Sequence, residues 1–480
     1  MKIIVRGLSS TYEAEHLARV FFPSARICAE TKHHKQDVIL VRVNKTNILC
    51  GVRYGNKLQY AKITAPVLHN GGDKDFEIAT HLYKLLCEFT GQKPVWGLLT
   101  GVRPVRIVHD MWAKGKTDAE VENTFANSFY VNQDKINLAM RTAHVQEPVM
   151  RLNTARSYSL YISIPFCPSR CSYCSFVSRS VDKSMALIPA YLAALEKEIA
   201  AISQLAERNA LKLETIYIGG GTPTSISAEQ LAHLMQTVRE CFDIGKLREY
   251  TVEAGRPDCT TAEKLDIIKK YGATRISINP QTLNDEVLAA IGRKHSAKDI
   301  IDCFNTARRL GHDNINMDLI AGLPKDTLPS FKESLAGVMS LRPENITVHT
   351  LTLKRASNIV IENQNEVYAD VAAMINSCQG LSTSGYEPYY LYRQKNTLQS
   401  LENTGYCLNG KEGLYNIFIM EEVHSILSAG AGGSTKLCAP SGRIERIFNY
   451  KYPHEYLSRF DTVIERKKGV DEFYAGYMDT

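Results

Sequence analysis

Three of the 12 cysteines, Cys167, Cys171 and Cys174, fall within eight residues of the chain. This Cys-x3-Cys-x2-Cys spacing differs from a structural zinc site, which takes four ligands in two close pairs, and from a thioredoxin-type pair. A four-iron, four-sulfur cluster is held by thiolates and normally takes four of them. Three cysteines on one loop would therefore leave one iron open, where a substrate can bind. Three unrelated buried cysteines would not explain this local density.

A second signal is the run Gly219-Gly220-Gly221-Thr222-Pro223-Thr224, directly after the strand-like residues 215–218. Glycines allow a ligand to approach the backbone closely and leave amide N–H groups facing outward. The run lacks the spacing of a dinucleotide loop and the lysine of a P-loop. By itself a tight turn explains it equally well. When it follows the three-cysteine strand in the same barrel, the run predicts a binding site for an amino-acid carboxylate or ammonium group. Tyr173 offers an aromatic face beside the cluster.

The elements that would position these residues begin near residue 158, where strand-like and helical segments alternate. The predicted strands are 158–165, 215–218, 250–254, 275–279, 314–320 and 345–353, and the predicted helices are 187–207, 228–241, 262–271, 298–310 and 330–341. Such repeats indicate a parallel sheet with crossover helices. Six repeats rather than eight predict a partial (β/α)6 barrel that is open on one side.

Three of these strands alternate polar and apolar residues toward their carboxyl ends. The polar positions are Thr251, Glu253, Ser277, Asn279, Asn316 and Asp318. A parallel sheet buried on both faces should instead be continuously apolar. An exposed sheet face is one explanation, but α/β barrels place their chemistry at this end of the strands, which favours a ligand site.

The rest of the chain defines the predicted organisation. Residues 1–150 are predicted to form an N-terminal α+β domain of unknown role, 151–365 the barrel, and 366–480 a C-terminal α+β region that covers the substrate. A net charge of +6 over 480 residues gives no indication of a nucleic-acid partner. No apolar run approaches the roughly 18–20 residues of a membrane span, and the first residues lack the apolar core of a signal peptide. A cytoplasmic location is therefore expected.

The motifs together resemble the radical S-adenosylmethionine (SAM) enzymes of the oxygen-independent coproporphyrinogen III dehydrogenase family. This family includes the HemN dehydrogenases and the HemW haem chaperones. The resemblance rests on YISIPFCPSRCSYCSF, GGGTPTS, YTVEAGRPD, RISINPQTLNDEVLAAIGRKH and NMDLIAGLPKDT within residues 158–360. Further stretches, WGLLTGVRPVRIVH, YRQKN, ENTGY, YNIFIMEE and GAGGSTK, resemble the HemZ-type branch over nearly the whole chain.

The resemblance implies a role for each matching residue. Cys167, Cys171 and Cys174 would hold a 4Fe–4S cluster whose fourth iron binds SAM. Tyr161 and Glu253 are implied as catalytic residues, Tyr161 at the substrate end. The implied SAM-binding residues are Tyr173, Gly220, Gly221, Thr222, Glu253, Gln281, Arg293 and Asp318.

The implied reaction is the oxidative decarboxylation of two propionates of coproporphyrinogen III to vinyl groups, through a 5′-deoxyadenosyl radical. An external donor such as flavodoxin or ferredoxin would reduce the cluster. Two departures leave alternatives open. Phe176 replaces a further cysteine of the HemN dehydrogenases, and Tyr415-Asn416 replaces a His-Asn pair of the HemW chaperones. A haem-opening radical SAM methyltransferase and a HemW-like haem chaperone remain the alternatives.

Overall fold

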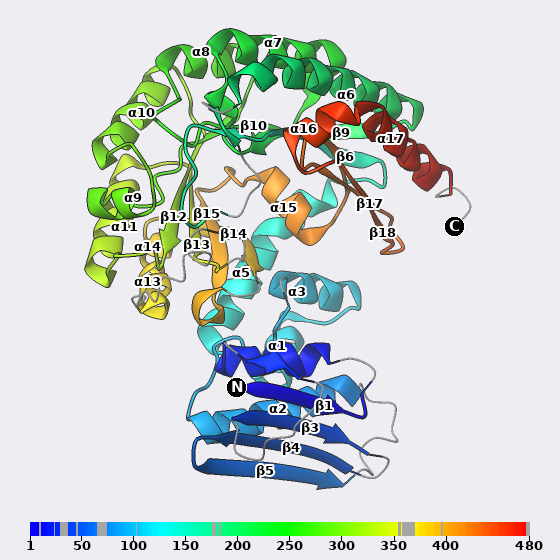
Figure 1. Cartoon of the computed structure of the whole chain (residues 1–480), viewed down its shortest axis with the longest axis vertical. Helices are drawn as coiled ribbons and strands as arrows, with labels where there is room; N and C mark the ends of the chain where they lie inside the picture. Colours follow the sequence, from blue (N-terminus) through cyan, green and yellow to red (C-terminus); the bar gives the residue numbers. More distant parts are fainter. Residues whose placement is uncertain are drawn as a thin grey trace. The chain divides into compact units, whose positions relative to one another are not determined.

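The computed structural model describes residues 1–8, 11–23, 25–28, 37–44, 47–64, 74–101, 103–174, 179–181, 184–353, 357, 370–394 and 397–476. Two compact units make up the chain (Figure 1). One comprises residues 1–140 and 393–401, and the other comprises 141–392 and 402–480. The three predicted functional domains, with boundaries near 150 and 365, stay a prediction.

The first unit is a five-stranded sheet with helices packed on one of its faces. The strand order is β2-β1-β3-β4-β5, with β1 (Lys2–Arg6), β2 (Arg26–Ile27), β3 (Val38–Val43), β4 (Asn47–Tyr54) and β5 (Lys57–Thr64). Alternate apolar residues of β1, β3 and β4 face the amphipathic helices α1 (Tyr12–Phe21) and α2 (Lys74–Thr90), and together they form the core. Helices α3 (Pro104–Ala113) and α4 (Asp118–Asn123) follow, and α5 (Gln133–Arg151) spans the division between the units.

The second unit is built on an 11-stranded sheet whose centre is the predicted parallel sheet. Six parallel strands follow one another in the order β6 (Ser157–Ile164), β9 (Lys212–Gly220), β10 (Glu249–Glu253), β11 (Arg275–Ser277), β12 (Ile315–Ala321) and β13 (Asn345–Thr350). At one end of these six strands, β13 pairs antiparallel with β15 (Glu402–Cys407). At the other end, β6 pairs parallel with β16 (Ser425–Ala429). The six strands therefore form the open, partial barrel that the repeat pattern predicts.

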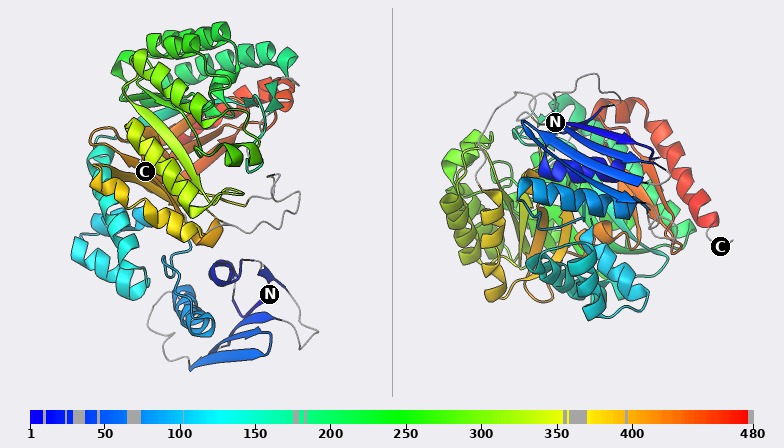
Figure 2. Two further views of the ribbon diagram at one scale, coloured as in Figure 1. Left: turned by 90° about the vertical axis from the view of Figure 1, so that its left-hand side faces the viewer. Right: turned by 90° about the horizontal axis from the view of Figure 1, so that it is seen from below.

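The crossover helices lie in an arc on the outside of these strands (Figures 1 and 2). They are α6 (Ile188–Arg208), α7 (Ala228–Cys241), α8 (Ala262–Lys270), α10 (Ala297–Arg309) and α11 (Leu328–Leu341), with a short helix α9 (Asp285–Ala290) that the periodicity did not predict. Local sequence explains several of their starts. Ser227 and Ser296 form capping boxes, and the hydroxyls of Thr261 and Thr327 accept hydrogen bonds from backbone N–H groups in the first turn.

The C-terminal segment extends both ends of the sheet. It contributes α13 (Val371–Ser377), β14 (Glu387–Arg393), α15 (Leu414–Glu421), β17 (Ser434–Cys438), β18 (Ile444–Phe448), α16 (Pro453–Ser458) and α17 (Phe460–Ala475). Glu198 of α6 ties this segment to the barrel from a fully buried position. Its carboxylate accepts hydrogen bonds from Gly430 N, Asn449 Nδ2 and Tyr456 Oη at 2.6–2.8 Å, and Lys467 Nζ lies 3.0 Å away. A buried charge with this many partners is satisfied.

The glycines of the stretch GAGGSTK, at residues 430–433, form the turn between β16 and β17. Gly430 has φ +93°, and a Cβ there would lie 2.6 Å from both Ser163 O and Tyr191 Oη. Only glycine fits where these two segments of the chain approach each other so closely. Within the described residues, no helix combines the length and apolar character needed to cross a bilayer.

Candidate functional site

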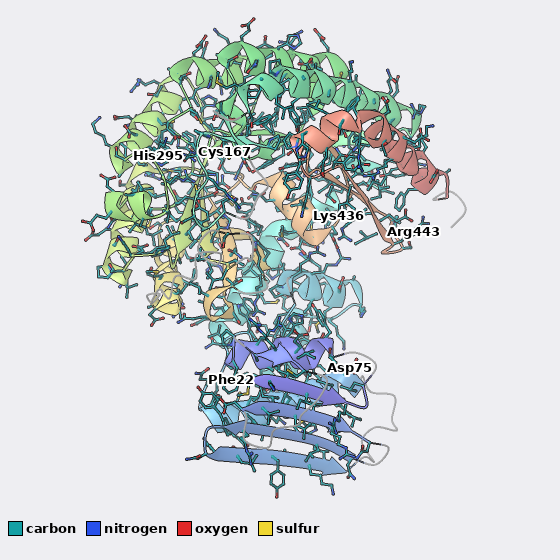
Figure 3. The ribbon with its side chains drawn as sticks, viewed as in Figure 1. Phe22, Asp75, Cys167, His295, Lys436 and Arg443 are labelled. Atoms are coloured by element: carbon teal, nitrogen blue, oxygen red, sulfur yellow. The ribbon has the colours of Figure 1, made fainter. Side chains whose placement is uncertain are left out.

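The three cysteines lie on the loop that leaves the carboxyl end of β6. Cys167 ends the short strand β7 (Phe166–Cys167), Cys171 is buried, and Cys174 N–H donates to Cys171 O at 3.1 Å. The residues directly after α9 hold this loop in place. Ser172 N–H donates to Ile291 O at 3.1 Å, and Ser169 Oγ donates to Gly292 O at 3.2 Å. None of the 12 cysteines forms a disulfide. Figure 3 shows Cys167 on the inner side of the helical arc.

Arg256 fixes the middle of this cysteine loop, and sequence reasoning did not single it out. Its buried guanidinium donates to Ser169 O and Ser169 Oγ at 2.9 Å, and forms a two-point ion pair with Asp258 at 2.7 and 3.0 Å. One of its nitrogens also lies 4.0 Å from Cys171 Sγ. A fixed positive charge here suits a negatively charged, thiolate-bound group. Both Arg256 and Asp258 belong to the family-like stretch YTVEAGRPD, which was the sequence signal that could have identified them.

The glycine loop follows β9 and lies directly against the cysteine loop. Gly220 has φ +116°, and a Cβ on Gly221 would lie 2.6 Å from Phe166 O and 3.0 Å from Cys167 Sγ. The buried Thr222 places its Oγ1 3.5 Å from Cys167 Sγ. The structure thus brings the two sequence signals into contact, and the glycines permit the close approach.

We expect Gly221→Ala to disturb the cysteine loop without unfolding the protein. The new methyl group meets backbone atoms of Phe166, which cannot move aside as a flexible side chain could. Reconstituted iron content should fall about threefold or more, and SAM affinity about tenfold. Iron analysis and equilibrium dialysis measure these effects. Gly380→Ala is the matched control, because a Cβ there meets nothing within 4 Å. Equal iron content in both variants would contradict the assigned contact.

Arg293, Tyr173 and Gln281 lie on the side of the cysteine loop near β11 and β12. Arg293 donates to Asn279 O at 3.2 Å and to Tyr173 Oη at 3.3 Å. Its Nε is buried and has no hydrogen-bond partner among the described residues, which leaves one donor for a ligand oxygen. Gln281 has φ +69°, and its backbone exchanges hydrogen bonds with Asp318 and Ile320 in β12. The structure therefore brings Arg293 and Tyr173 together. The hydrogen bonds described for Gln281 are those of its backbone with β12.

Glu253, the last residue of β10, points into the barrel beside the glycine loop. Tyr217 Oη donates to Glu253 Oε1 at 2.7 Å. Burial raises the pKa of the Glu253 carboxyl to about 7; the hydrogen bond from Tyr217 lowers it, the charge of Asp318 raises it, and a backbone hydrogen bond from Gly220 lowers it. Glu253 therefore changes its charge near neutral pH, which is typical of functional carboxylates.

Asp318 faces the same interior from β12 and stays ionised. Asn316 Nδ2 donates to its Oδ1 at 2.7 Å, and His349 Nε2 lies 3.7 Å from its Oδ2. Burial raises the pKa of Asp318, but His349 and the hydrogen bonds from Asn316 and Thr347 outweigh this effect and lower it. His349 thus lies beside Asp318 at the site. Two carboxyl groups whose pKa values are moved in opposite directions therefore face the same barrel interior.

Three tyrosines form the floor below these carboxyl groups. Tyr161 stacks on Tyr217 and Tyr415 with ring centroids about 6 Å apart, and Tyr217 and Tyr415 stack at 4.5 Å. Tyr415 comes from α15, whose first turn enters the barrel because Glu249 accepts the Leu414 and Tyr415 N–H groups at 2.8 and 3.1 Å. The substrate-end position that the resemblance implied for Tyr161 stays a prediction, and Tyr217 and Tyr415 were not expected in this cluster. Alternation along β9 offered a signal for Tyr217; nothing local indicated Tyr415.

These residues fit the cofactors of the predicted chemistry. Among the described residues, no three histidine, cysteine, aspartate or glutamate side chains surround a single metal-ion position. A cubane differs from such a site because each thiolate binds a different iron. Three cysteines on one loop, an adjacent glycine cradle and the unsatisfied Arg293 Nε suit a cluster that carries a small zwitterionic ligand.

Two basic residues of the stretches WGLLTGVRPVRIVH and YRQKN, Arg106 and Arg393, lie in the first unit. Arg106 pairs with Asp110 on the surface of α3 at 2.9 Å. Arg393 donates to the carbonyls of Leu99 and Ser400, and its guanidinium lies over the Trp96 ring. These contacts give Arg393 a structural role. Lys395 and Phe176 lie outside the described residues.

Comparisons with known proteins point to one superfamily. Residues 161–336 match the family described as the radical SAM superfamily. The oxygen-independent coproporphyrinogen-III oxidase-like protein HemZ of Bacillus subtilis is 39% identical over 391 residues, which cover 80% of this chain and 78% of that protein. The haem chaperone HemW of the same organism is 41% identical over 197 residues, 41% of this chain and 51% of HemW.

Among solved structures, the coproporphyrinogen III oxidase HemN of Escherichia coli has a similar fold. The TM-score is 0.51 at 23% identity, over 67% of this chain and 72% of that one. The barrel with its three-cysteine loop therefore defines a radical SAM protein, a superfamily that uses a 4Fe–4S cluster and SAM. More narrowly, the chain belongs to the oxygen-independent coproporphyrinogen III oxidase family that includes HemN, HemW and HemZ, in its HemZ-type branch.

Proposed function

We propose that this protein oxidatively decarboxylates coproporphyrinogen III to protoporphyrinogen IX. The observation that carries the proposal is the joint placement of the cysteine loop, the glycine loop and the carboxyl pair Glu253–Asp318 at one end of the barrel. It is supported by similarity to HemZ along most of the chain. When bound, the reduced cluster and SAM supply a 5′-deoxyadenosyl radical that can remove one hydrogen atom from a propionate β-carbon.

The chain's residues would then bind and orient the reactants. Cys167, Cys171 and Cys174 would hold the cluster, with the Arg256 charge beside them. The glycine loop and the Arg293 Nε would hold the polar groups of SAM, and Asp318 its ribose hydroxyls or sulfonium. Glu253 would bind the SAM ammonium group in its ionised form. Tyr161 would contact the substrate from the aromatic floor.

Each conversion removes a hydrogen atom, carbon dioxide and one electron from a propionate and leaves a vinyl group. The electron must pass to an external acceptor, and a separate donor such as flavodoxin or ferredoxin would reduce the cluster. We place the reaction in the cytoplasm, where a reducing environment preserves such clusters and thiols.

A haem chaperone of the HemW type is the second candidate, because several relatives have that name. The His-Asn pair implied for those chaperones is here Tyr415-Asn416. Tyr415 is buried in the aromatic floor, and Asn416 Nδ2 donates to Tyr389 Oη at 3.1 Å. Neither side chain therefore offers a haem iron an imidazole ligand. A radical SAM methyltransferase acting on haem is the remaining alternative.

The test is anaerobic incubation of the reconstituted, dithionite-reduced protein with SAM and coproporphyrinogen III. Mass spectrometry should detect 5′-deoxyadenosine together with tetrapyrrole products that have lost one and two carboxyl groups. A methylated, ring-opened pigment would support the methyltransferase instead. SAM cleavage with an unchanged porphyrinogen would discard this substrate, and stoichiometric haem uptake without SAM cleavage would favour the chaperone.

A further inference from the structure

The sheet of the first unit carries the chain's excess positive charge on strands that contain no acidic residue. Residues 1–140 hold 19 lysines and arginines against 13 aspartates and glutamates, a difference equal to the +6 of the entire chain. None of the strands β1 to β5 contains Asp or Glu. The net charge of +6, which is weak for 480 residues, is therefore concentrated in the first 140.

Strand register places the basic residues on one face of this sheet. Because α1 and α2 cover the face that bears Ile3, Ile39 and Cys50, the alternate residues lie on the opposite face. One row across the strands is Arg6, Arg42, Leu49 and Lys62. A parallel row is Arg26, Lys2, Val38, Arg53 and Leu58. We call this surface the basic face; it holds six basic side chains.

An apolar row lies between the two basic rows. It consists of Ile4, Leu40, Gly51 and Tyr60 in register. Ile4 is covered and Leu40 is half-buried, so the accessible part lies on β4 and β5. There Tyr60 is 71% exposed, the neighbouring Leu58 is 59% exposed, and Gly51 adds no side chain beside the ring. A large exposed aromatic side chain bordered by positive charge is typical of a binding surface.

From this arrangement we propose that the basic face binds single-stranded RNA. An apolar row with an exposed ring accepts unstacked bases, and basic rows on both sides accept the backbone phosphates. A duplex would present phosphates but keep its bases stacked, so Tyr60 would gain nothing from it. An acidic protein would match the charges but would not depend on a single exposed ring. This binding is independent of the reaction proposed above.

The test uses the full chain with its cluster reconstituted anaerobically, and a fluorescein-labelled 20-nucleotide RNA of mixed sequence without secondary structure. Fluorescence anisotropy should show binding that weakens with salt. Tyr60→Ala should weaken it about tenfold, as expected for loss of one stacked base. Arg42→Glu with Lys62→Glu should weaken it at least about tenfold and reduce the slope of log affinity against log salt by about 1.4. All three side chains are exposed, so the fold should be retained.

The control variant Lys114→Glu with Lys197→Glu makes the same change in net charge at exposed positions off the basic face. It should bind RNA like the wild type. Equal weakening by the control would show general charge attraction and overturn the proposal. If Tyr60→Ala binds RNA as the wild type does, and heparin or duplex RNA binds equally well, the face recognises polyanions such as an acidic protein surface, and the RNA assignment is wrong.

Discussion

Replacing Cys171 with alanine is expected to abolish cluster assembly and SAM cleavage. Cys171 is the buried, central member of the three cysteines, and Arg256 lies 4.0 Å from its Sγ. Its loss leaves only two of the three thiolates that would hold the cluster. Formation of 5′-deoxyadenosine should fall at least about 100-fold, beyond the 10- to 100-fold typical of residues that only support a metal ligand. Cluster assembly is measured by the absorbance of the thiolate-to-iron bands after reconstitution. Formation of 5′-deoxyadenosine is measured by mass spectrometry.

Cys241→Ala is the matched control for this variant. Cys241 is half-buried at the end of α7, and Ser203 Oγ contacts its backbone carbonyl rather than its thiol. It should keep the cluster and full SAM cleavage. Retention of a four-iron cluster and normal turnover by Cys171→Ala would refute the cluster assignment.

Glu253→Gln is expected to remove the pH dependence of SAM binding. The wild-type carboxyl, with a pKa of about 7, is ionised at pH 8 and largely protonated at pH 6. Since the ionised form is proposed to bind the SAM ammonium group, wild-type affinity should fall about tenfold between pH 8 and pH 6. The glutamine variant should bind SAM weakly at both pH 8 and pH 6. Its affinity should be close to that of the wild type at pH 6. Isothermal titration over this range makes the comparison.

The stability of the same variant separates a lost contact from a damaged fold. The pKa of Glu253 is raised from its ordinary 4.5 to about 7, so its stabilising contribution is complete below pH 4.5 and is lost as the pH rises to about 7. Glu253→Gln should therefore have a higher thermal midpoint than the wild type at pH 8 and a similar one at pH 4.5. A lower midpoint at pH 8 would indicate structural damage instead.

Tyr217→Phe is the conservative companion to this variant. It keeps the ring in the aromatic floor and removes only the hydrogen bond that lowers the pKa of Glu253. The pH at which SAM binding is half-maximal should therefore move upward. An unchanged profile would mean that Tyr217 does not control the charge of Glu253.

Local sequence determined much of this protein. The spacing of Cys167, Cys171 and Cys174 indicated the cluster, because three ligands on one loop need no distant partner. Hydrophobic periodicity predicted all six barrel strands, and the alternation of polar residues indicated that Glu253 and Asp318 face the interior. These signals are local because side-chain direction alternates regularly along a strand.

Only the tertiary structure decided which distant residues meet at the site. Tyr415 reaches the aromatic floor because Glu249, far away in the chain, accepts hydrogen bonds from the first turn of α15. The neutral-range pKa of Glu253 likewise depends on burial and on neighbours from β9 and β12. The basic face exists because strand register aligns Arg6 with Arg42. In each case the property arises from contacts between segments that only packing brings together, and no single segment contains it.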